Sequence, residues 1–132
     1  MDLEGWNVHV HRSSKGTQMS EFAFGYIELG QVSTYKVMDP LLASLYAEFS
    51  ELSKKKPQDV LSSNKVNLVN RVMVPILEML DKEPMRSFLD LLNDEDLPQN
   101  SDVILMLGQC RAAMATFKNR HFDLKHGWHV EV

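Results

Sequence analysis

The chain has 132 residues, of which 44% are apolar and 24% are charged, and its formal net charge is −4. These values are typical of a soluble globular domain and exclude a largely disordered chain. The acidic balance also argues against a dedicated nucleic-acid binder, and no stretch approaches the roughly 18 apolar residues of a membrane span. We therefore expect one domain over residues 1–132 without a membrane partner.

The only cysteine and the first residues bear on localisation. Cys110 has no second cysteine with which to form a disulfide, so a reducing compartment is expected. Residues 1–6 lack the basic start and the apolar stretch of a signal peptide. The sequence thus predicts a cytoplasmic protein.

The N-terminal third has the pattern of strands. Trp6, Val8 and Val10 alternate with polar residues, which is the period of a half-buried strand. Residues 21–29 predict a second strand that forms an N-terminal hairpin with the first. Residues 31–37 fit either a third short strand or a linker. We expect residues 1–38 to be mainly strand and hairpin.

Two long helices are expected to follow. Asp39 and Pro40 predict a helix start, since aspartate caps a helix and proline suits its first position. Positive charge at residues 54–56 favours the end of this helix. Ser62 or Ser63 is then expected to cap the second helix, in which a proline at position 75 predicts a kink or break.

A short helix is expected over residues 85–92, followed by a polar loop. Asn100 or Ser101 is expected to cap the last long helix. Its apolar stripe recurs at helical spacing: Val103, Leu107, Cys110, Met114 and Phe117. The tail, residues 123–132, ends in an alternating Trp-His-Val-Glu-Val run that is typical of a strand.

These elements predict an α+β fold. A small antiparallel sheet formed by the N-terminal hairpin, which a C-terminal strand can join, packs on about four helices over residues 39–122. A mostly helical domain with a terminal hairpin is the alternative.

Histidines at the two chain ends suggest a metal site. His9 and His11 lie on one face if their segment is a strand, and pairing with the tail would add His129 and Glu131. Three nitrogens and one carboxylate suit zinc or another first-row metal. The alternative is that these polar side chains simply occupy the solvent face of the sheet. No other cofactor and no catalytic residue is predicted.

Other candidates have structural interpretations. His121 is expected to support a helix C-terminus, and Cys110 to pack in the core, where burial suppresses its reactivity. The acidic group at residues 93–96 predicts a solvated turn. Eight methionines are expected to fill the core, with an exposed methionine-rich groove as the alternative.

Uneven charge suggests a partner. Residues 78–102 contain eight acidic and two basic side chains, which would favour a charged partner. The sequence therefore predicts a small non-catalytic binding or regulatory protein that acts through a protein–protein interface. A homodimer could form through a terminal strand. The alternatives are a metal-binding protein or metal-dependent enzyme using His9, His11 and His129, and ligand binding in a helix–sheet cleft.

Overall fold

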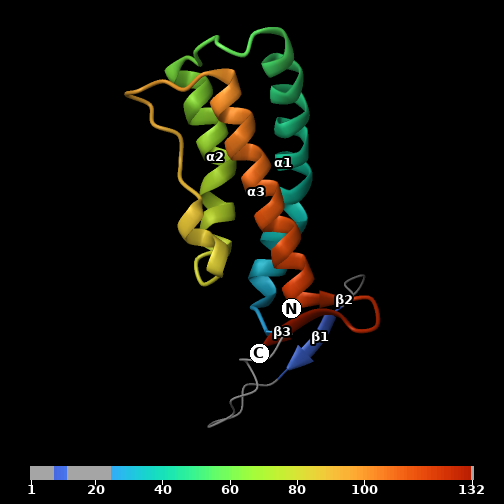
Figure 1. Ribbon diagram of the computed structural model, residues 1–132. Coiled ribbons are helices and arrows are strands. Elements are labelled where there is room, and N and C mark those ends of the chain that lie inside the picture. The colour runs from blue at the N-terminus through green and yellow to red at the C-terminus, as the bar shows by residue number, and fades with distance from the viewer. Residues whose placement is uncertain (1–7, 12–24, 132) are drawn as a thin grey trace.

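The computed structural model describes residues 8–11 and 25–131. Helices α1 (Leu29–Lys55), α2 (Ser63–Met79) and α3 (Asn100–His121) lie side by side, and a small sheet lies at one end of them (Figure 1). The sheet contains the strands β1 (Val8–His11), β2 (Phe122–Asp123) and β3 (Gly127–Glu131). The α+β class is confirmed. The described residues form three α-helices, however, because the expected fourth helix is the short 3₁₀ helix η2 (Pro84–Phe88).

The sheet differs from the predicted N-terminal hairpin. Its strand order is β1-β3-β2, in which β3 pairs parallel with β1 and antiparallel with β2. The hairpin is therefore C-terminal, and its turn ends at Gly127, whose φ of 74° favours glycine. Of the predicted second strand, residues 21–24 lie outside the described residues, and Ile27 forms only an isolated bridge to Val130. The C-terminal strand allowed by the sequence is present, and it pairs with the N-terminal strand, although in parallel rather than in the antiparallel sheet predicted.

Helix α1 begins ten residues before the predicted start. Glu28 is its N-cap, and Glu28 and Gln31 form a capping box, with the Glu28 N–H donating to Gln31 Oε1 at 2.9 Å. The expected strand or linker at residues 31–37 is therefore helical, and Pro40 lies inside the helix. Buried side chains at helical spacing, among them Val32 and Leu42, explain how packing carries the helix through the proline.

The other helix boundaries are close to those predicted. Ser62 caps α2 by accepting the Lys65 N–H at 3.2 Å, as expected. Pro75 does not break α2, which continues to Met79. At α3 the cap is Gln99 rather than the residues predicted, and the side chain of Asn100 instead donates to the Lys56 carbonyl at 2.9 Å. That bond joins the end of α1 to the start of α3.

The core lies between the three helices, and β3 closes it at one end. Trp128 packs its ring 4.9 Å from Tyr35 and 6.1 Å from Phe117, measured between ring centroids. Burial, and then the charge of Asp39, raises the pKa of Tyr35 to about 12. Several methionines fill this core as expected: Met38, Met73, Met79 and Met114.

Candidate functional site

Strand β3 carries the C-terminal half of the predicted metal set. Its Cα register with β1 pairs His9 with His129 and His11 with Glu131. The four predicted residues thus occupy neighbouring positions on two adjacent strands. His129 is buried and Glu131 is exposed. The side chains of His9 and His11 lie outside the described part of the chain.

An aspartate that sequence reasoning missed holds His129. His129 Nε2 donates to Asp123 Oδ2, while Asp123 Oδ1 accepts the backbone N–H groups of Lys125 at 2.9 Å and His126 at 2.8 Å. Desolvation alone would raise the pKa of Asp123, but the N–H of His126, the imidazole of His129 and the N–H of Lys125 outweigh it and lower this pKa to about 2. The sequence signal was an aspartate four residues before the turn glycine Gly127.

His121 lies in the last turn of α3, as predicted, but it is buried and has specific partners. Its Nδ1 lies 2.7 Å from the Gly25 carbonyl oxygen, and its Nε2 lies 3.1 Å from Glu83 Oε2. Glu83 Oε1 lies 3.0 Å from Arg120 Nε. Because Glu83 is held between two basic side chains, this cluster fastens the end of α3 to the turn before η2. We interpret it as a structural clamp.

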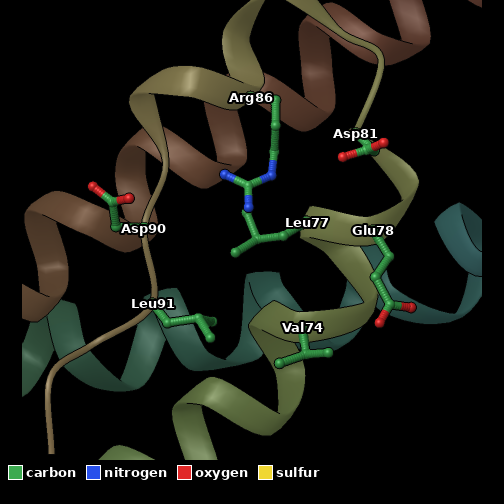
Figure 2. A pocket seen from close by; sticks show the side chains of 7 residues that line it. All are labelled: Val74, Leu77, Glu78, Asp81, Arg86, Asp90 and Leu91. Carbon is green, nitrogen blue, oxygen red and sulfur yellow. The ribbon is translucent and has the colours of Figure 1, made fainter.

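A cavity of about 410 Å³ lies between the C-terminal part of α2 and the residues that follow this helix, up to Leu91. Figure 2 shows its lining, which combines three carboxylates, one guanidinium and three apolar side chains: Val74, Leu77, Glu78, Asp81, Arg86, Asp90 and Leu91. We call this cavity the acidic pocket. The sequence indicates the excess of acidic residues at 78–102 but gives no signal for a pocket there.

Two side chains shape the acidic pocket. Asn70 of α2 binds the backbone of Leu92 twice, since its Nδ2 donates to the carbonyl oxygen and its Oδ1 accepts the N–H, both at 2.9 Å. These bonds hold the extended segment after η2 beside α2. Arg86 Nη1 donates to the Leu89 carbonyl oxygen at 2.7 Å, which fixes the guanidinium over the pocket. Hydrogen bonds therefore hold in place both the backbone beside the pocket and the guanidinium above it.

The charge and the polarity of the acidic pocket determine what it can bind. One guanidinium faces three carboxylates, from Glu78, Asp81 and Asp90, so the site is acidic overall. Val74 and Leu91 are exposed apolar side chains at its rim. Nearby, Phe88 on η2 has 78% of its surface exposed. A ligand with cationic and apolar groups side by side fits this combination.

Two other predicted features have the structural roles expected of them. Cys110 is fully buried on α3, and desolvation raises its pKa to about 12, so the thiol is a core group. In the acidic turn at residues 93–96, Asn93 Oδ1 accepts the N–H groups of Glu95 and Asp96. The side chains of this turn are exposed, as predicted.

The described residues, 8–11 and 25–131, contain neither a metal cluster nor a membrane-spanning helix. Among them, no group of three or more histidine, cysteine, aspartate or glutamate side chains is arranged to hold a metal ion. No helix there combines the length and the apolar character needed to cross a bilayer. Comparisons with protein-family models, with curated proteins and with solved structures gave no match to this chain.

Proposed function

We propose that this chain is a small, non-catalytic cytoplasmic protein that binds a segment of a partner protein in the acidic pocket. The partner segment carries a lysine or arginine beside a large apolar side chain. The observation that carries this proposal is the combination of three carboxylates with apolar side chains in the lining of one cavity, whose backbone wall is held to α2 by the hydrogen bonds of Asn70. The single buried Cys110 supports a reducing compartment.

The carboxylates and the apolar side chains of the acidic pocket both contribute to recognition. The carboxylates attract a cationic side chain and disfavour an acidic one, so they select the partner and speed its approach. Exposed Val74 and Leu91 offer apolar area, and Phe88 is an exposed aromatic group of the kind that anchors interfaces. Because Arg86 is held by the Leu89 carbonyl, its charge sits at a fixed place and constrains how the partner's cation enters.

A random peptide library displayed on phage tests this function. Peptides enriched on the wild-type chain are expected to carry Lys or Arg next to an apolar residue. Their affinity, measured by fluorescence anisotropy, should fall at least about tenfold in the variant Glu78→Gln/Asp81→Asn/Asp90→Asn, and it should fall with rising salt.

The exposed acidic turn supplies a matched control. The variant Asp94→Asn/Glu95→Gln/Asp96→Asn removes the same three charges outside the pocket and should retain most of the affinity. An equal loss in both variants would mean that only the overall charge matters. That result, or the absence of enriched peptides, would refute peptide binding in this pocket.

Metal binding at the sheet is the second candidate, because one observation favours it. The register pairs His9 with His129, and histidines that ligate metals commonly donate their other ring N–H to a carboxylate, as His129 does to Asp123. Zinc, or another first-row metal, would be held by His9, His11, His129 and Glu131.

Native mass spectrometry of tag-free protein with added zinc tests the second candidate. The wild type is expected to carry one zinc ion, and His9→Ala/His11→Ala should carry none. His126→Ala removes a half-exposed histidine outside the predicted set and is the control, which should keep the ion. Unchanged zinc stoichiometry in the double variant would rule the site out.

A further inference from the structure

Helix α1 carries a second apolar face besides the one in the core. Its core face contains Val32, Leu42 and Phe49, which are buried. Val37, Leu41 and Leu52 remain exposed, and they lie on one side of the helix because their spacings of four and eleven residues are close to whole helical turns. These three exposed side chains are spread over about 22 Å of helix, with polar residues such as Glu48 between them.

Near Leu52, at the C-terminal end of α1, a groove lies between α1 and α2. A cavity of about 210 Å³ lies between Leu45, Glu48, Phe49 and Leu52 of α1 and Lys65 and Leu68 of α2. We call it the α1–α2 groove. It shares no lining residue with the acidic pocket. Leu68 is 55% exposed, so its side chain stands at the edge of the groove and is available to a partner.

The charges of the α1–α2 groove indicate its occupant. Among the described residues that line it, Glu48 on one helix and Lys65 on the other are the charged ones, so the groove is electrically balanced. In a dimer with two-fold symmetry, the same surface of each copy contacts the other. Glu48 of each copy can then face Lys65 of the other copy. A partner of one charge sign would leave one of these two groups unmatched.

The net charge of the chain also favours the α1–α2 groove as the contact between two copies. Two copies each carrying −4 repel one another, and most strongly where the acidic pocket would meet its equal. At the balanced α1–α2 groove this repulsion is least, while the exposed leucines supply the apolar area that homodimer interfaces use. The neighbouring pair Glu51 and Lys54, 3.5 Å apart, adds no net charge.

We infer that the α1–α2 groove is the contact surface for a second copy of this chain, which places α1 and α2 of each copy against those of the other. Two helices packed on two helices is a common and stable arrangement. This dimer differs from one formed through a terminal strand, because it uses the helices and leaves the sheet edge untouched. It also stands independently of peptide binding in the acidic pocket.

Sedimentation velocity of the full chain over a range of concentrations tests this inference. The wild type is expected to dimerise, and Leu68→Glu should weaken the dimer at least about tenfold, since each copy would place a charge in the interface. Leu105→Glu on α3 is the matched control. Leu105 is 69% exposed and lies outside the groove, so this variant should dimerise like the wild type. Circular dichroism checks that both variants remain folded.

Charge exchange gives a second and independent readout. Glu48→Lys places four like charges at the interface and should weaken the dimer, whereas Glu48→Lys/Lys65→Glu restores opposite pairs and should recover it. A wild type that stays monomeric at all concentrations would overturn the inference. So would a dimer that is insensitive to both Leu68→Glu and Glu48→Lys, because it would form through another surface such as the terminal strand.

Discussion

Asn70 is the residue on which the shape of the acidic pocket depends most. Its amide satisfies both the N–H and the carbonyl oxygen of Leu92, each at 2.9 Å. We expect Asn70→Ala to lower the free energy of unfolding by about 1–3 kcal/mol, because two partly buried backbone groups lose their partner. Urea denaturation measures this loss. Asn67→Ala, at an exposed position of the same helix, is the control, and an equal effect there would contradict the role of Asn70.

Asp123 makes stability depend on pH in acid. Its pKa is lowered to about 2 in the folded protein, from a usual value of 3.8, so the carboxylate binds a proton more weakly when folded. Its contribution to stability is therefore complete above about pH 4 and is lost as the pH falls from there toward 2. We expect the stability difference between wild type and Asp123→Asn to shrink over this interval in urea titrations. A difference that stays constant with pH would contradict this linkage.

Residue-level prediction succeeded where the signal was local. The burial of Cys110 followed from its place on an apolar stripe, and Ser62 was one of the two serines predicted to cap a helix from their position before a helical pattern. Asp123 was missed because its role depends on the geometry of a turn that brings it to His129, and Glu83 because its role depends on a distant partner. Glu83 meets His121, 38 residues away, and no periodicity in the sequence encodes such a contact.

At the scale of elements, the end of α3 is fastened by the clamp at Glu83. The Glu83 side chain is 7% exposed and lies between Arg120 and His121. We expect Glu83→Gln to lower the free energy of unfolding by roughly 1–3 kcal/mol, since it removes a buried carboxylate that lies against the Arg120 guanidinium and the His121 imidazole. Thermal unfolding measures the change, with Glu78→Gln as the control in the same region. Equal stability of the two variants would show that the clamp contributes little.

The start of α1 shows why an element boundary was misplaced. Asp39 and Pro40 form a strong local start signal, and residues 21–29 are rich in aromatic residues, which favour strands. The burial of Val32 and Met38 against the rest of the molecule overrides both preferences. The weaker pair Glu28 and Gln31 is the true cap.

For the molecule as a whole, sequence patterns predicted the class but not the sheet topology. The alternating pattern at both ends correctly indicated two strands that could pair with each other. It could not give the direction, since a period of two is the same in parallel and antiparallel strands. The structure shows that β1 runs parallel to β3, and that the hairpin forms between β2 and β3 instead. The four metal candidates were brought into register by the same pairing.

We expect strand β3 to acquire its two neighbouring strands in a definite order during folding. Its partner β2 is only a tight turn away, whereas Val8 pairs with Trp128 across about 120 residues. Closing the longer loop in an unfolded chain costs roughly 3 kcal/mol more entropy. Once α1 and α3 have packed, and Ile27 has bridged to Val130, most of that cost has already been met.

Strand β1 should therefore be the last element to acquire protection in refolding. Pulse-labelling hydrogen exchange is expected to show the amides of α1 and α3 protected first and those of residues 8–11 afterwards. Simultaneous or earlier protection of β1 would contradict this order. Two predicted metal residues, His9 and His11, reside on that late strand, so any metal site they complete would assemble only in the final folding step and could report its completion.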